Sequence, residues 1–205
     1  LRTAPTKSAL LNLRKQVRFL VDGHALLERK RELLTRLVYQ HIKEYQGKKG
    51  TAHAALRKAY RWLAIAQLRM GDRSIAQATL GATPSTTMKV LPRRALGVQY
   101  PSVEAAVVAP QPVGLLGTDP SFDEARKSFA EAAVRLAELA AVEMALHRLI
   151  SEQRKAQKRV NALKYNIIPS YRKVIKQIAE SLEEEERGTL FQIKRLRDAS
   201  VKKRT

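Results

Sequence analysis

Few residues of this chain combine the types and spacing that catalysis requires. The segment GKKGT at residues 47–51 weakly resembles a phosphate-binding loop, but it lacks the spacing GxxxxGK followed by Ser or Thr, and no strand precedes it. The chain has no Cys, which excludes disulfides and thiolate metal ligands. We find neither a nucleophile paired with a base nor a dinucleotide-binding fingerprint. The sequence therefore predicts no catalytic residue, no metal and no cofactor, and it favours a mechanical or binding part over an enzyme.

Histidines and clustered carboxylates are the remaining candidates for metal binding. The four histidines form no convincing ligand pair with another His, Asp or Glu at helical spacing. Two of them, His24 and His41, fall on a hydrophobic seam, where a polar residue more often fixes the register of a coiled coil than binds a metal. The run EEEE at residues 183–186 is typical of a solvated helix face, with Glu183 and Arg187 placed for an i,i+4 ion pair.

The charge of the chain indicates an acidic partner. Its 205 residues carry a formal net charge of +20. Residues 1–60 hold 14 Lys or Arg against 4 Asp or Glu, and residues 121–205 hold 19 against 12, so both ends are heavily charged. Nucleic acid, an anionic membrane surface or an acidic protein cavity would each attract such a chain. No stretch approaches the 18 uninterrupted apolar residues of a transmembrane helix.

The first part of the chain has the pattern of a coiled-coil helix. Apolar residues recur in alternating steps of three and four, which is the spacing of a heptad seam. Thr6 is placed to cap a helix that runs from about residue 7 to 69, with a weak point at the two glycines of GKKG. The seam consists of Leu10, Leu13, Val17, Leu20, Leu27, Leu34 and Val38.

The middle of the chain breaks this pattern. Six of the eight prolines lie between Pro84 and Pro120, and glycines recur between residues 71 and 117, so helix is not expected there. Residues 89–101 and 103–109 have the composition of a short, irregular β-hairpin.

A second long helix restarts near residue 121. Ser121 is placed as its N-cap, with Glu124 at the capping-box position. After Val160 the seam gains additional steps of four, which locally unwind a coiled coil, and Pro169 falls inside this zone, where it predicts a kink. The seam consists of Leu136, Leu139, Leu146, Ile150, Val160, Leu163, Ile167, Val174 and Ile178.

These elements predict an all-α protein: a long antiparallel two-helix coiled coil with a small Pro/Gly-rich head. We expect residues 1–70 to form the N-terminal helix, residues 71–120 an irregular head with a possible short hairpin, and residues 121–205 the C-terminal helix. At 1.5 Å per residue the two helices would span roughly 95 and 120 Å.

Three segments resemble one family. The segment RVNALKYNIIP at residues 159–169 closely resembles the C-terminal signature of the D subunits, which form the central shaft of V-type and archaeal A-type rotary ATPases. The N-terminal helix at residues 4–34 and the acidic run with its basic helix end at residues 183–197 are similar to the same family. The residues that carry the first two matches are Pro5, Thr6, Gly23, Leu26, Leu27, Lys30, Arg31, Arg159, Val160, Asn161, Ala162, Leu163 and Pro169.

The resemblance implies a non-catalytic rotor subunit of the central stalk, which transmits torque between the ATP-hydrolysing or ATP-synthesising hexamer and an ion-translocating membrane ring. It implies a shaft inside the hexamer of catalytic A and non-catalytic B subunits, an F subunit at its side, and a socket subunit, C or d, above the ring. It also implies a cytoplasmic chain, peripheral to the membrane as part of a membrane-bound complex that couples ATP to protons or sodium ions. The ATP sites belong to other chains, and the chain itself binds no nucleic acid and does not insert into the membrane.

Two hypotheses about residues follow from the implied role. The kink at Pro169 would make the shaft asymmetric, so that rotation presents a different face to each surrounding subunit. Basic residues near the tip would attract acidic loops of the hexamer without locking at one angle, because exposed ion pairs are weak and exchangeable. These residues are Arg14, Arg18, Arg29, Lys30, Arg31, Lys194, Arg195 and Arg197.

The same charge and helical pattern leave alternatives open. A basic coiled coil that binds nucleic acid, or that acts as a scaffold, explains the net charge of +20 equally well. Against nucleic acid, no aromatic stacking platform interleaves with the basic residues. A membrane-curving helical hairpin would need basic residues on one face and an amphipathic wedge, and neither is visible.

Overall fold

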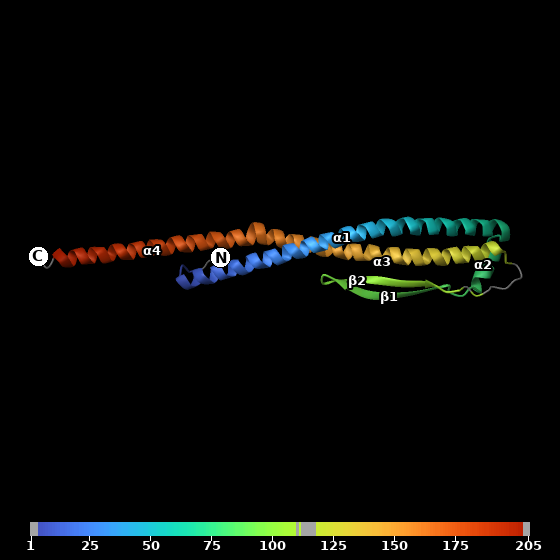
Figure 1. The fold of residues 1–205 in the computed structure, drawn as a ribbon, viewed down its shortest axis with the longest axis horizontal. Coiled ribbons are helices and arrows are strands. Elements are labelled where there is room, and N and C mark those ends of the chain that lie inside the picture. Colours follow the sequence, from blue (N-terminus) through green and yellow to red (C-terminus); the bar gives the residue numbers. More distant parts are fainter. Residues whose placement is uncertain (1–3, 110, 112–117, 203–205) are drawn as a thin grey trace. The chain divides into compact units, whose positions relative to one another are not determined.

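The fold is known from a computed structural model, which describes residues 4–109, 111 and 118–202. Two long helical stretches pack antiparallel, with a β-hairpin between them in sequence, and this confirms the predicted fold class (Figure 1). In chain order the elements are α1 (Lys7–Met70), α2 (Asp72–Leu80), β1 (Thr86–Ala95), β2 (Val98–Val107), α3 (Pro120–Ala162), the π-helical turn η1 (Leu163–Ile167) and α4 (Ile168–Lys202).

The chain divides into two compact units. The first comprises Leu1–Arg31 and Arg154–Thr205, and the second comprises Glu32–Gln153. The first unit therefore contains the start of α1, the end of α3, η1 and α4, whereas the second contains the rest of α1 and α3, α2 and the hairpin. The predicted division of the chain at residues 70 and 120 stays a prediction, and part of the predicted head lies outside the described residues.

Helix α1 continues through the GKKG segment. Gly47 and Gly50 are exposed, and a Cβ added at either would meet nothing within 4 Å. Neither glycine therefore serves a close approach, and the helix simply tolerates them. The start of α1 is capped as predicted, because the hydroxyl oxygen of Thr6 accepts a hydrogen bond from the Ala9 N–H at 3.2 Å.

Helix α2 corrects the expectation that no helix follows Gly71. Gly71 has φ 74°, a left-handed conformation that ends α1 and turns the chain. The sequence DRSIAQATL then contains neither Pro nor Gly, and Asp72 lies in its first turn, where it complements the helix dipole. The composition of the whole segment, rich in Pro beyond residue 84, concealed this short helix.

The hairpin is confirmed, but its turn lies elsewhere than predicted. Strands β1 and β2 pair antiparallel from Thr86 opposite Val107 to Ala95 opposite Val98. The turn residues Leu96 and Gly97 both have positive φ, 51° and 80°, as a tight primed turn requires. The predicted break at residue 102 was wrong, because Pro92 and Pro101 pair with each other inside the strands. Proline is tolerated there since a two-stranded sheet has only edge strands.

The N-cap of α3 is Asp119 and not Ser121, so this prediction was wrong. The helix begins at Pro120, and proline favours the first helical position because the N–H it lacks has no partner there anyway. The Asp119 carboxylate accepts the Ser121 backbone N–H at 2.9 Å and also the Ser121 hydroxyl. These two bonds, with Arg69 adding to them, hold the pKa of Asp119 below its usual value.

Small residues dominate the core of the second unit. Ala52, Ala59 and Ala66 are fully buried on α1 at heptad spacing. On α3 the buried residues include Val142, Ala145 and Leu149. Alanine leaves room for two helix backbones to approach closely, and the loss of larger apolar side chains is the cost of that approach.

Candidate functional site: the antiparallel helical pair

Contacts across the helical pair fix its register. In the second unit Lys58 pairs with Glu131 at 3.5 Å, and the rings of Tyr60 and Phe129 meet edge to face at 5.5 Å between centroids. In both contacts the two residue numbers add up to 189. A constant sum is what an antiparallel pair of regular helices requires, because each step forward on one helix is a step back on the other.

The first unit holds two further contacts of this kind. Arg31 donates from Nη1 to Oε1 of Gln157 at 3.3 Å, and Lys7 pairs with Glu186 at 2.7 Å. The α1 residues of these contacts are 24 positions apart, whereas their partners are 29 positions apart. The C-terminal side therefore uses more residues over the same stretch. A π-helical turn takes up about one extra residue, and the reach of the long side chains absorbs others.

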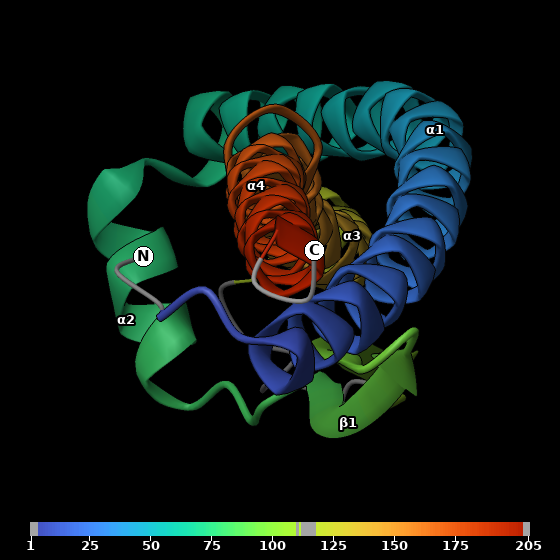
Figure 2. The same ribbon diagram turned by 90° about the vertical axis from the view of Figure 1, so that its left-hand side faces the viewer.

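The extra residue lies in the segment that carries the family resemblance. The turn η1 covers Leu163–Ile167, and the Ile168 N–H bonds the carbonyl of Leu163, five residues back. This turn stands out from the helix in the orange part of the chain (Figure 1 and Figure 2). Pro169 is the second residue after the turn, and because it has no N–H it cannot bond the carbonyl of Tyr165 as it would in a regular α-helix.

The residue after the proline bonds its own helix through its side chain. Ser170 donates from Oγ to the carbonyl oxygen of Asn166 at 2.7 Å. Pro169 thus lies between a widened turn before it and a side-chain bond of Ser170 after it. The predicted local unwinding of the helix corresponds to this π turn, while the kink assigned to Pro169 stays a prediction.

Two parts of the family signature meet through one glutamine. Gln157 accepts from Arg31 and donates from Nε2 to Oδ1 of Asn161 at 2.8 Å. Arg31 belongs to the N-terminal signature and Asn161 to the C-terminal one. Beside them Val160 is 2 % exposed and fills the interior. The signature residues Pro5, Leu26, Lys30, Arg159 and Pro169 are exposed, and Gly23, Leu27, Ala162 and Leu163 are half-buried.

The predicted seam residues differ in burial. Leu13, Leu34, Val160 and Ile178 are buried, and most of the others are half-buried: Leu10, Val17, Leu20, Leu27, Val38, Leu139, Leu146, Ile150, Leu163 and Val174. Leu136 and Ile167 lie exposed, at 42 % and 37 %. On α3 between residues 142 and 156 the buried face is displaced by about one residue from the predicted seam, because alanines such as Ala145 and Ala156 supply the closest packing.

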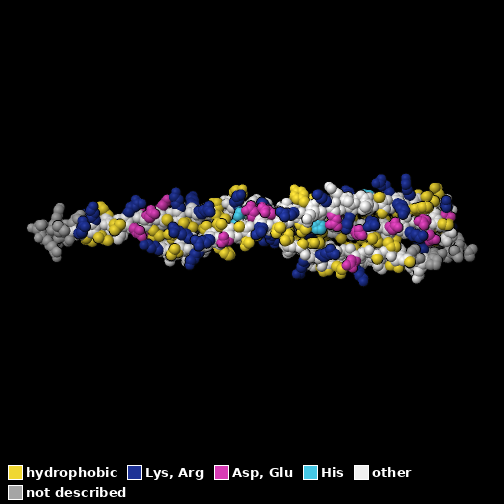
Figure 3. All heavy atoms as spheres, in the orientation of Figure 1, with side chains coloured by type: hydrophobic (Ala, Val, Ile, Leu, Met, Phe, Trp, Pro, Cys, Tyr) yellow, Lys and Arg dark blue, Asp and Glu magenta, His cyan; other side chains and the backbone are white. Residues whose placement is uncertain are grey.

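The predicted basic residues all lie in the first unit and extend along its helices. Only Arg31 is half-buried, and the other seven are exposed. Arg14 and Arg31 are separated along α1 by roughly 26 Å at 1.5 Å per residue, so the set forms no single cluster. Figure 3 shows Lys and Arg side chains scattered among apolar and acidic ones over the visible face.

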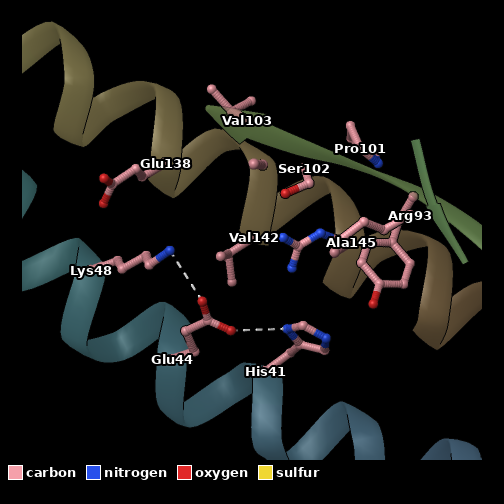
Figure 4. Close-up of a pocket in the computed structure, with 12 residues that line it drawn as sticks. His41, Glu44, Lys48, Arg93, Pro101, Ser102, Val103, Glu138, Val142 and Ala145 are labelled. Atoms are coloured by element: carbon pink, nitrogen blue, oxygen red, sulfur yellow. Dashed lines mark ion pairs between the residues drawn. The ribbon is translucent and has the colours of Figure 1, made fainter. Parts of the chain in front are cut away.

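A polar cavity in the second unit is lined by residues of both long helices and of the hairpin (Figure 4). Its volume is about 320 Å³. On α1, Glu44 pairs with His41 at 3.2 Å and with Lys48 at 3.1 Å, and the His41 ring meets the edge of Tyr100 from β2 at 5.8 Å between centroids. Arg148 of α3 also donates to the carbonyl of Gln99 at 2.9 Å.

These contacts fix the hairpin against the helices and provide no nucleophile. His41 was predicted on the seam without its partners; the i,i+3 and i,i+4 spacing of Glu44 and Lys48 was the available signal. Within the described ranges, no group of three or more His, Asp or Glu is placed to hold a metal ion. No described helix is long and apolar enough to cross a membrane.

Comparison with known proteins identifies the family. The family model for the D subunit of ATP synthase matches residues 9–198. The chain belongs to the ATP synthase D-subunit family. It is 34% identical over 196 residues to the V-type ATP synthase D subunit of Thermotoga neapolitana, covering 95% of this chain and 97% of that one.

Two archaeal relatives are similar over nearly their whole length. The A-type ATP synthase D subunit of Methanosphaera stadtmanae is 32% identical, with 93% of this chain and 91% of the relative covered. That of Pyrococcus furiosus is 30% identical, with 96% and 94% covered. The chain is accordingly a central-stalk component of a V/A-type ATP synthase and is not itself catalytic, as the sequence predicted.

Proposed function

We propose that the chain is the rotating shaft that transmits torque between the hexamer of A and B subunits and the ion-translocating ring. The observation that carries the proposal is the register of the helical pair. The Arg31–Gln157 contact holds it in the first unit, and the Lys58–Glu131 contact holds it in the second. A shaft must transmit twist without slipping along its own seam. Antiparallel helices with fixed cross-contacts and a tightly packed core resist that slip.

The C-terminal part of α4, in the first unit, is proposed to lie inside the hexamer. Leu190, Phe191 and Leu196 are exposed on α4 at 66%, 62% and 71%. Lys194 and Arg195 lie among them, and the Arg195 guanidinium stands over the Phe191 ring at 6.0 Å. Apolar and basic side chains mixed in this way suit a protein cavity that offers apolar walls and acidic loops.

We extend the proposal to the other partners that the resemblance to D subunits implies. We assign the F subunit to the side of the helical pair and the socket subunit, C or d, to the head formed by α2 and the hairpin. The chain would then be cytoplasmic and peripheral to the membrane, held there by its partners. The π turn before Pro169 would give the shaft the asymmetry that couples its angle to the opening and closing of the surrounding subunits.

Reconstitution tests the assignment. The chain is mixed with A and B subunits of the same source, and the complex is examined by native mass and ATPase rate. One copy per hexamer with altered ATP turnover supports the shaft. Failure to form a complex, with salt-sensitive binding to nucleic acid instead, supports a basic coiled coil that binds nucleic acid.

A further inference from the structure

A second cavity of the second unit is largely apolar and contains one charged residue. It has a volume of about 510 Å³ and is bounded by α1, α2, the segment at residues 82–86 and α3. Ile75 of α2 and Phe122 and Phe129 of α3 contribute to its wall, together with several alanines. This volume is in the range of pockets that bind small ligands or single side chains of a partner.

Arg126 is the only charged residue among the described residues that line this cavity. Its side chain is 11 % exposed. Its Nη1 donates to the carbonyl of Gln111 at 3.1 Å and lies 3.6 Å from Oδ1 of Asp123, while the guanidinium stands over the Phe122 ring at 5.9 Å. Its Nη2 is buried and has no hydrogen-bond acceptor among the described residues.

Within the described part of the chain this donor has no acceptor, and a partner protein can supply one. A buried N–H group without a partner lowers stability, and native proteins usually satisfy such groups. Asp123 is 58% exposed, so its long contact compensates the arginine charge only weakly. A carboxylate suits this position, because its two oxygens match a guanidinium and its single charge balances one arginine. A phosphate dianion would keep an uncompensated charge in apolar surroundings.

We propose that this cavity binds an apolar side chain of a partner protein whose neighbouring carboxylate pairs with Arg126. The partner is the socket subunit, so the inference rests on the proposed docking of the head. The cavity lies between α2 and α3 in the part assigned to that docking, and its lining is apolar except for the guanidinium and a few hydroxyls. An acidic residue beside a Leu- or Phe-sized residue has both features that the site recognises.

A small probe tests the cavity in the full-length chain. Octanoate carries an apolar tail and a carboxylate, and octanol carries the same length of tail with a neutral hydroxyl in place of the carboxylate. With ¹³C-labelled alanine methyl groups, octanoate should shift the signals of the lining residues Ala82, Ala125, Ala130 and Ala133 in a saturable way, and octanol should not. Arg126→Gln should abolish the shift. Arg135→Gln, which changes an exposed arginine of the same helix, should preserve it.

Binding to the socket subunit of the same source tests the partner. Removing one member of a buried charge pair should weaken this binding by at least about 30-fold for Arg126→Gln. Arg135→Gln should leave it within about twofold, since exposed ion pairs contribute little. Ala133→Leu keeps the arginine but fills the cavity, and it should also weaken binding, so a folding defect of one variant does not decide the matter.

The outcomes separate the inference from the function on which it rests. If the wild-type chain binds the socket subunit and Arg126→Gln binds equally well, the inference is overturned and the docking stands. If the wild-type chain does not bind the socket subunit at all, the docking is wrong and the partner assigned here falls with it. Equal shifts with octanoate in the wild-type chain and in Arg126→Gln, or no shift in either, overturn the carboxylate site itself.

Discussion

Arg31 donates a hydrogen bond to Gln157 at 3.3 Å, across 126 positions of the sequence. Gln157 in turn donates a hydrogen bond to Asn161, so the N-terminal and C-terminal signature segments meet at one point of the helical pair. The contact lies within the first unit, beside the buried Val160. A polar link at one point of a helical seam favours one register, because a slip by one turn would break this hydrogen bond.

Gln157→Ala removes both hydrogen bonds and leaves the Arg31 guanidinium with fewer acceptors. We expect a loss of about 1–2 kcal/mol in the free energy of unfolding, since each net bond contributes about 0.5–1.5 kcal/mol. Urea unfolding followed by circular dichroism measures this. Lys158→Ala is the matched control, at an exposed neighbouring position with similar helix propensity. Equal losses of unfolding free energy in both variants would show that the Gln157 side chain does not fix the register.

Pro169→Ala restores an N–H that can bond the carbonyl of Tyr165. We expect helix content to rise and the π turn to relax toward α-helix, because the cause of the interruption is gone. If the π turn gives the shaft its asymmetry, the number of ATP molecules hydrolysed per rotation should rise in reconstituted complexes. Unchanged coupling in a variant with proven structural change would show that asymmetry at this turn is dispensable.

The carboxylate that caps α3 makes the stability of the folded chain sensitive to acid. The pKa of Asp119 is lowered in the folded chain, first by the Ser121 hydroxyl, then by the Ser121 N–H and Arg69. A lowered carboxyl pKa contributes stability above the unfolded value near pH 4, and that stability is lost as pH falls through the lower folded value. The pKa of Glu186 is lowered by Lys7 and acts with the same sign.

Asp119→Asn isolates this contribution. Asparagine still accepts the hydrogen bond of the cap but does not titrate. Thermal midpoints measured from pH 7 to pH 3 should fall more steeply for the wild-type chain than for Asp119→Asn below about pH 4. Identical slopes would mean that the cap carboxylate does not contribute to acid unfolding.

From the basic end of α4 we expect binding to the A/B hexamer that depends on salt concentration. Lys194 and Arg195 are exposed, and their replacement by Gln should weaken binding to the A/B hexamer by about three- to tenfold at low salt. The difference should shrink as salt rises, since screening already weakens the same interaction in the wild-type chain. Arg172→Gln with Lys173→Gln is the control, an exposed basic pair in the same helix. An equal effect of both doubles would indicate that net charge alone matters.

The sequence predicted the long elements because their signals are local. Heptad spacing and the Thr6 cap defined α1, and the two prolines 92 and 101 obscured the turn of the hairpin without hiding the hairpin. The buried face of α3 was displaced because alanine gives only a weak hydrophobic signal, yet the buried Ala145 and Ala156 lie where the helices approach. The hydrogen bond between Arg31 and Gln157 joins residues 126 positions apart, and the cavity beside Arg126 is lined by residues from 63 to 133, so no spacing rule finds either.

Observing rotation tests the central claim most directly. Because the chain has no Cys, Thr87→Cys on the exposed β1 strand gives a single site for attaching a bead. With the A/B hexamer fixed to a surface and one chain bound in each, ATP should drive rotation of the bead in one direction, and the rotation should stop without ATP. A complex of the same composition that hydrolyses ATP while the bead stays still would contradict the shaft.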